Sequence, residues 1–134
     1  MSQGVAVVGI YVSDQDEALA FYTEKLGFEV HTDVKNGTYR WLTVRYPEQS
    51  VVQLGLFVPE SPMIDADSAR ALRALVAKGA MPPLVLEVKD VRATCARFES
   101  KGVELTQPPV ERFGSVDASF RDPSGNGWKI VQSR

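Results

Sequence analysis

The sequence contains few residues that could carry chemistry on their own. His31 is the only histidine and Cys95 the only cysteine. One chain therefore cannot form an internal disulfide, nor a site that needs two or more imidazoles. Cys95 lies between Val91 and Phe98 at helical spacing, which favours a small core residue over a reactive thiol. His31 lies in a polar stretch, which favours a solvated side chain over a catalytic base.

The elements that would position a site come as a repeat. The segment VVGIYVSDQDEALAFYTEKLGFEV at 7–30 resembles PLVLEVKDVRATCARFESKGVEL at 83–105. Each copy reads as a strand, a capping aspartate (Asp14 or Asp90), a helix with an apolar stripe, and a glycine stop. Three extended stretches follow each helix, near 29–33, 40–45 and 51–58 in the first half and near 104–107, 116–121 and 128–132 in the second. The sequence therefore predicts an α+β fold of two βαβββ modules.

These elements divide the chain into module one at 1–58, a connector at 59–82 and module two at 83–134. The connector has prolines at both ends and holds a short amphipathic helix. We expect all three parts to form a single domain, because 134 residues fit one compact unit.

Three motifs occur in order along the chain: VSDQDEALAFYTEKLGF at 12–28, LEVKDVRATCARFESKGVE at 86–104 and FRDPSGNGWKIVQ at 120–132. Together with the repeat, they resemble the vicinal oxygen chelate superfamily, which includes glyoxalase I, bleomycin-resistance proteins and extradiol dioxygenases. The resemblance covers nearly the whole chain. It implies paired βαβββ modules whose sheets curl around a shared cavity, within a homodimer.

The resemblance also implies where a metal ion would be held. Family members that use a metal carry one ligand seven residues before each capping aspartate and one in the fourth strand of each module. The matching positions are Val7 and Pro83, then Gln53 and Lys129, and both pairs are 76 residues apart. Only Gln53 could donate an oxygen, because valine and proline side chains have no lone pair and an ammonium repels cations. We therefore expect no bound metal and no cofactor.

Strand parity predicts which side chains line the cavity, because successive side chains point to opposite faces of a sheet. The faces that carry the four ligand positions are taken as inward. Alternate residues are expected to pack under the helices, among them Val8, Ile10, Val12, Leu42 and Val44. The inward residues predicted to contact a ligand are Tyr11, Trp41, Thr43, Gln53, Phe57, Glu87, Asp117, Ser119 and Lys129. Aromatic walls with a few polar groups suit a flat, partly polar small molecule.

Several of these residues also have a purely structural interpretation. Trp41 and Tyr11 fill the core of a small curled sheet as often as they stack on a ligand. Lys129 is expected to pair with Glu87 or Asp117 slightly more readily than to act as a catalytic amine. Catalytic residues are therefore left unassigned.

The favoured function is a protein that binds a small aromatic molecule without metal, such as an antibiotic, as the resemblance to the bleomycin-resistance branch implies. The alternative is a glyoxalase-like lyase, isomerase or dioxygenase. A metal-independent form would use Glu87 or Asp117 as the general base and Lys129 to stabilise an enolate or carboxylate. A metal-dependent form would have only Glu87, Asp117 and His31 as donors. Both alternatives stay open at this point.

Composition narrows the partners. The formal net charge is −2 and the basic residues are scattered, so we expect no nucleic acid partner. Apolar runs stay far below the roughly 18 residues that span a bilayer, and the N-terminus lacks a basic leader, so we expect no membrane partner and a cytoplasmic location.

Overall fold

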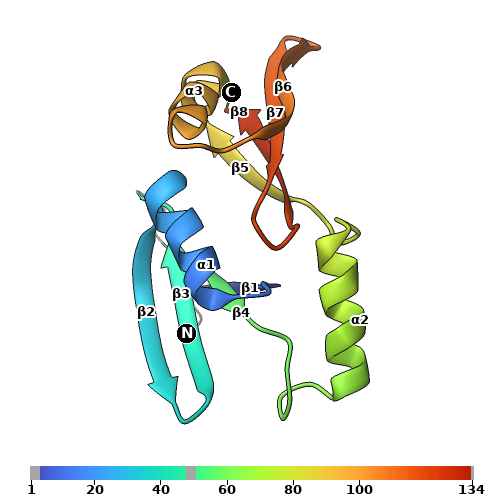
Figure 1. Cartoon of the computed structure of the whole chain (residues 1–134). Coiled ribbons are helices and arrows are strands. Elements are labelled where there is room, and N and C mark those ends of the chain that lie inside the picture. The colour runs from blue at the N-terminus through green and yellow to red at the C-terminus, as the bar shows by residue number, and fades with distance from the viewer. Residues whose placement is uncertain (1–3, 48–50, 134) are drawn as a thin grey trace. The chain divides into compact units, whose positions relative to one another are not determined.

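The computed structural model describes residues 4–47 and 51–133. The chain divides into two compact units, Met1–Ala74 and Leu75–Arg134, and the boundary falls within helix α2 (Ala66–Ala77). Each unit has its own four-stranded mixed sheet and its own helix (Figure 1). The predicted α+β fold of two βαβββ modules is confirmed, and neither sheet closes on itself.

Unit one contains the first sheet, in the spatial order β1-β4-β3-β2. Its elements are β1 (Val7–Tyr11), α1 (Gln15–Ala20), the π-helical turn η1 (Phe21–Lys25), β2 (Glu29–Asn36), β3 (Tyr39–Arg45) and β4 (Gln53–Phe57). β1 pairs with β4 in parallel, and the other neighbours are antiparallel. The parallel pair places the end of β1 beside the end of β4.

The helical segment of unit one begins and ends where the sequence predicts. The Asp14 carboxylate accepts a hydrogen bond from the backbone N–H of Glu17 at 2.9 Å, which satisfies a donor of the first turn. Tyr22 and Leu26 are buried on the apolar side. Gly27 ends the segment with a φ of 82°, a left-handed conformation that glycine adopts at little cost.

The side chains of β3 alternate as predicted. Leu42 and Val44 are fully buried on the helix-covered face, whereas Trp41 is 38% exposed on the other face. On β1 the prediction is wrong for Val8, which was expected under a helix and is 47% exposed. α1 contacts β4, while β1 is the outer strand, so the short helix does not reach Val8.

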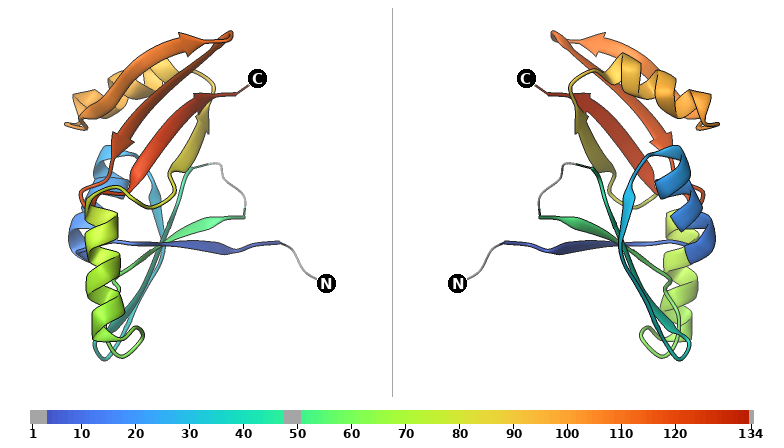
Figure 2. Two further views of the ribbon diagram at one scale, coloured as in Figure 1. Left: turned by 90° about the vertical axis from the view of Figure 1, so that its right-hand side faces the viewer. Right: turned by 90° about the vertical axis from the view of Figure 1, so that its left-hand side faces the viewer.

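Unit two repeats this arrangement in the spatial order β5-β8-β7-β6. Its elements are β5 (Leu84–Val88), α3 (Val91–Ser100), β6 (Leu105–Arg112), β7 (Ser115–Arg121) and β8 (Gly127–Gln132). α3 contacts β6, β7 and β8 and lies along one face of the sheet (Figure 2). The Asp90 carboxylate caps α3 by accepting from the N–H of Ala93 at 3.0 Å.

The buried side of α3 includes the single cysteine. Cys95 lies in the core with Val91 and Phe98, as the helical spacing predicts. Burial raises the pKa of the Cys95 thiol, which keeps it protonated. It is therefore a core residue.

Strand β6 is longer than the sequence indicates. We predicted an extended stretch near 104–107, but the strand continues to Arg112 and turns through Phe113 and Gly114, both with positive φ. Pro108 and Pro109 argued against a longer strand because proline cannot donate to a sheet ladder. β6 is an edge strand, and its register with β7 shifts between Gln107 and Val110, so the prolines are accommodated there.

A compact turn joins β7 to β8 around Asp122, which is buried. Its Oδ1 accepts from the backbone N–H groups of Ser124, Gly125 and Asn126 at 2.9–3.0 Å. Its Oδ2 accepts from the side-chain amide of Asn126 at 2.9 Å. The predicted turn chemistry at 122–126 is confirmed.

Helix α2 ends against this turn. Val76 is buried, and a Cβ built on Gly125 would come within 2.9 Å of the Ala77 backbone, so glycine is required for this close approach. Among the residues that the structure describes, no helix is long and apolar enough to cross a membrane.

Candidate functional site

An aromatic surface lies on the face of the first sheet that the helix leaves uncovered. Tyr11 pairs with Phe57 across β1 and β4, and Trp41 shares its face with Thr43, which pairs with Gly55. The rings of Trp41 and Phe57 contact each other with centroids 4.9 Å apart and planes tilted by 40°. Trp41 remains partly exposed. The sheet therefore presents an accessible pair of aromatic rings.

Two glycines make room for this arrangement. A Cβ built on Gly55 would lie 2.6 Å from Cζ of Phe57, and one built on Gly9 would lie 3.1 Å from Cδ2 of the same ring. The Phe57 ring thus lies over the backbone of both strands. The two glycines serve close packing of this ring within the unit.

Thr43 and Gln53 form a polar pair beside the rings. Thr43 is fully buried, and its hydroxyl donates to Oε1 of Gln53 at 2.8 Å. Gln53 is half-buried. In this arrangement Gln53 offers surface to a ligand, and Thr43 holds the Gln53 side chain in place.

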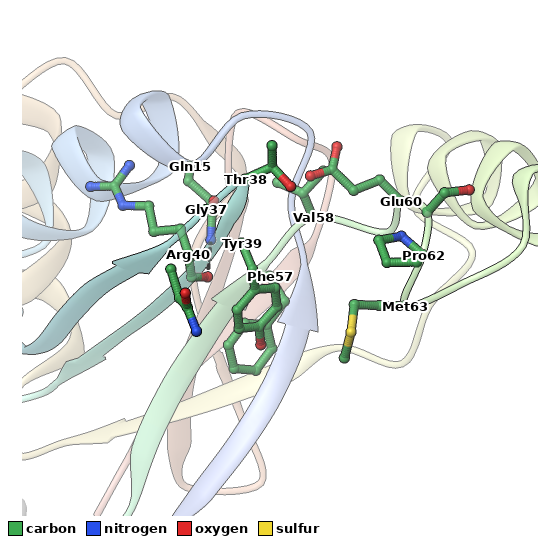
Figure 3. Close-up of a pocket in the computed structure, with 12 residues that line it drawn as sticks. Gln15, Gly37, Thr38, Tyr39, Arg40, Phe57, Val58, Glu60, Pro62 and Met63 are labelled. Atoms are coloured by element: carbon green, nitrogen blue, oxygen red, sulfur yellow. Dashed lines mark hydrogen bonds between the residues drawn. The ribbon is translucent and has the colours of Figure 1, made fainter.

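A pocket of about 340 Å³ opens at the end of this face. It lies between the β2–β3 hairpin, the end of β4 and the loop that follows β4 (Figure 3). Tyr39, Phe57 and Met63 supply most of its apolar lining, and Gln15, Arg40 and Glu60 supply polar groups. Phe57 belongs to both the aromatic pair and the pocket, so the two are continuous.

Arg40 lines the pocket, but its guanidinium group is already engaged. Nε and Nη2 donate to the two carboxylate oxygens of Asp33 at 2.8 and 2.9 Å, and Nη1 donates to Asp16 at 2.7 Å. These hydrogen bonds hold the pKa of Arg40 above its usual range and lower the pKa of Asp33. The positive charge of Arg40 is therefore offset by two carboxylates.

Gln15 connects the helix to the strands that carry the rings. Its amide nitrogen donates to the carbonyl oxygen of Arg40 on β3 at 3.1 Å and to that of Leu56 on β4 at 2.8 Å. Each carbonyl is adjacent in sequence to a ring residue, Trp41 or Phe57. Gln15 thus fixes α1 to both ring-bearing strands.

The predicted polar residues of module two lie on the second sheet. Ser119 pairs with Lys129, and Asp117 and Glu87 both pair with Val131. Asp117 accepts a hydrogen bond from Gln107 at 2.9 Å. The nine predicted ligand-binding residues therefore divide into five on the first sheet and these four on the second.

The expected ion pair of Lys129 is absent from the part of the chain that the structure describes, where neither Glu87 nor Asp117 contacts its ammonium group. The pairing was predicted from shared strand parity alone. In the register, Lys129 lies one row away from both carboxylates, and Asp117 is occupied by Gln107.

Comparison with known proteins identifies the family. The model of the Glyoxalase/Bleomycin resistance protein/Dioxygenase superfamily matches residues 4–130. The chain belongs to this superfamily. Among solved structures of similar fold, UcmS2 is 42% identical with a TM-score of 0.92, covering 99% of this chain and 100% of its own.

Two further relatives of this glyoxalase/bleomycin-resistance chain bear on function. TnmS3, described as an antibiotic binding protein from Streptomyces sp. CB03234, is 29% identical with a TM-score of 0.76, covering 99% of this chain and 98% of its own. The uncharacterized protein YurT of Bacillus subtilis (strain 168) is 36% identical over 129 residues, 96% of this chain and 98% of YurT.

The strand register corrects one assignment made from the superfamily pattern. Gln53 and Lys129 were matched because they are 76 residues apart, as the two capping aspartates are. In the structure Gly9 pairs with Gly55 and Val85 pairs with Lys129, and Gly9 and Val85 each stand five residues before their capping aspartate. The counterpart of Lys129 is therefore Gly55, and the last strands are offset by 74 residues.

This correction reduces the number of side chains that could ligate a metal at the superfamily positions. If Lys129 marks the fourth-strand position, its partner Gly55 has no side chain. If Gln53 marks it, the same offset leads to Gly127. Within residues 4–47 and 51–133, no group of three or more His, Cys, Asp and Glu side chains is placed to hold a metal ion. His31 is exposed, and its Nδ1 lies 2.8 Å from the Thr32 hydroxyl.

Sequence reasoning missed most of the pocket. Tyr39 has the strand parity of Trp41, so its position could have been predicted, and Gln15 directly follows a predicted cap. Glu60 and Met63 belong to a loop whose path no periodicity indicates.

Proposed function

We propose that the protein binds a small, flat aromatic molecule without a metal ion and thereby sequesters an antibiotic or a related natural product. The exposed pair of Trp41 and Phe57 carries the proposal, since aromatic side chains offer large, rigid surfaces for stacking. The likeness to TnmS3, an antibiotic binding protein, supports the same ligand class.

The absence of metal from this proposal rests on the chemistry of the superfamily positions. Val7 and Pro83 have no donor atom, and one of the two fourth-strand positions is a glycine in either alignment. A single remaining side chain cannot compete with water for a transition metal. A homodimer in the cytoplasm completes the proposal, and sedimentation at micromolar concentration tests the dimer.

The experiment that tests the function replaces Trp41 by Ala and measures binding of hydroxymethylanthracene by fluorescence polarisation. Loss of a stacking anchor should weaken binding by roughly 1–3 kcal/mol, about 5- to 150-fold. Folding should largely survive, because Trp41 is partly exposed.

Leu42→Ala provides the matched control on the opposite face of the same strand. Leu42 is fully buried, so its truncation should destabilise the fold by about 2–5 kcal/mol while the remaining folded protein still binds the probe. If Trp41→Ala instead destabilises the fold severely and leaves affinity unchanged, Trp41 is a core residue and the stacking proposal fails.

A second candidate function is a metal-independent enzyme built on the second sheet. The observation in its favour is Lys129, whose ammonium is held by no carboxylate among the described residues and so can meet a substrate carboxylate or enolate. Glu87 or Asp117 would then act as the general base. Turnover lost in Lys129→Ala but kept in Trp41→Ala would favour this function over sequestration.

A further inference from the structure

We propose that the pocket beside Phe57 accepts a protonated amine carried by the aromatic ligand, with Glu60 as its counter-charge. This inference rests on the proposed function and adds the chemical class of one ligand substituent. The volume of about 340 Å³ is near the lower end of small-molecule pockets, so it suits a substituent or a small ring rather than a whole large ligand.

The charges around the pocket favour a cation. Arg40 and Glu60 are the only charged side chains that line it. Arg40 donates through Nε, Nη1 and Nη2 to Asp33 and Asp16, so little of its charge is left for a ligand anion. Glu60 forms no ion pair with any of the described residues. The charge that remains for a ligand is therefore negative.

Gln15 adds a neutral acceptor to the same pocket. Its amide nitrogen must face the carbonyl oxygens of Arg40 and Leu56, because an amide oxygen cannot donate to them, and this fixes the amide orientation. Oε1 accepts no hydrogen bond from the described residues, and it is not among buried atoms left without a partner, so it retains access to solvent. Glu60 and Gln15 thus both offer acceptors to a donor group.

The remaining walls fit the carbon part of such a substituent. Tyr39 comes from the hairpin on one side of the pocket, and Met63 comes from the loop on the other side (Figure 3). Phe57 joins this lining to the aromatic pair. An alkyl amine attached to a ring stacked at Trp41 would therefore pass along apolar surface before reaching the acceptors.

The test uses three probes with one ring system: aminomethylanthracene, hydroxymethylanthracene and anthracene carboxylate. The wild-type protein should bind the amine about two- to five-fold tighter than the alcohol, the range expected of a partly exposed ion pair, and should bind the carboxylate weakest. Glu60→Gln should abolish the preference for the amine without changing affinity for the alcohol. High salt should reduce the preference in wild type, because exposed charges are screened.

Glu24→Gln is the matched control, since Glu24 is exposed on η1 and does not line the pocket. It removes the same charge and should keep the preference for the amine. Equal binding of amine and alcohol by wild type, or a preference that survives Glu60→Gln, would overturn the inference. In that case a loss of alcohol binding in Trp41→Ala would still uphold the proposed function. If wild type binds none of the three probes, both proposals fail.

Discussion

The ring of Phe57 lies across Gly55, in the space that a side chain at that position would fill. The same ring contacts Trp41 and lines the neighbouring pocket, so a residue without a side chain decides where the aromatic surface sits. The strand pattern alone shows Gly55 as an inward position with nothing to offer. In the structure it is the position that allows Phe57 to lie flat.

Replacing Gly55 by Ala should displace the Phe57 ring. The added Cβ would lie 2.6 Å from Phe57 Cζ, so the ring must move and its contact with Trp41 should weaken. We expect a cost of about 1–3 kcal/mol in the free energy of unfolding and a changed near-ultraviolet circular dichroism spectrum. Gly127→Ala is the control, because a Cβ there meets no atom within 4 Å. A wild-type spectrum and stability in Gly55→Ala would contradict this account.

Replacing Asp122 by Ala should strongly destabilise the protein. The substitution removes the acceptor of three backbone N–H groups and one side-chain amide in a buried turn. Unsatisfied buried donors are expensive, so we expect a loss of about 3 kcal/mol or more in denaturant unfolding. Asp67→Ala removes an exposed carboxylate that pairs with Arg70 and should cost about 0.5 kcal/mol or less. Similar losses for both variants would show that the turn does not depend on Asp122.

Acid should weaken the protein partly through Asp33. The paired Arg40 lowers the pKa of Asp33 in the folded state, so its contribution to stability is present above the unfolded pKa of about 4 and is lost as the pH falls through the lower folded pKa. The Asp33 side chain is about one third exposed, so the contribution should not exceed about 1 kcal/mol. The stability difference between wild type and Asp33→Asn should therefore shrink from pH 7 to pH 2.5. A difference that stays constant would exclude this pair as a source of acid sensitivity.

Divalent transition metals should leave the protein unchanged. Zn²⁺, Ni²⁺, Mn²⁺ or Fe²⁺, added singly or removed with a chelator, should shift the melting temperature by less than about 1 °C, because no superfamily ligand pair is intact. Elemental analysis of purified protein provides an independent measurement. A content of about one metal ion per chain that is lost together with stability on chelation would contradict the proposal.

Local sequence rules predicted the elements well where one residue controls the outcome. Asp14 and Asp90 cap their helices because a carboxylate three residues before a free N–H has an obvious partner. Alternation placed Leu42 and Trp41 on opposite faces because successive strand residues cannot share one.

Other features depend on lengths and contacts that no local pattern carries. Alternation assigned Val8 to the helix side, but it cannot tell how far a short helix extends across a sheet. The pocket depends on the loop through Glu60 and Met63, whose path is set by tertiary contacts. The ligand-binding roles of the residues predicted on both sheets, from Tyr11 to Lys129, stay predictions.

The two-residue difference between the halves also limits how this fold can be lengthened. Seven residues (46–52) connect β3 to β4, whereas five (122–126) connect β7 to β8. A change of two residues moves a strand along its neighbour by one full pleat and keeps each side chain on its own face, whereas a change of one would exchange the faces. Insertions in these hairpins should therefore be tolerated in even steps, and an engineered loop longer by a single residue should turn Phe57 toward the helix and Leu56 toward solvent.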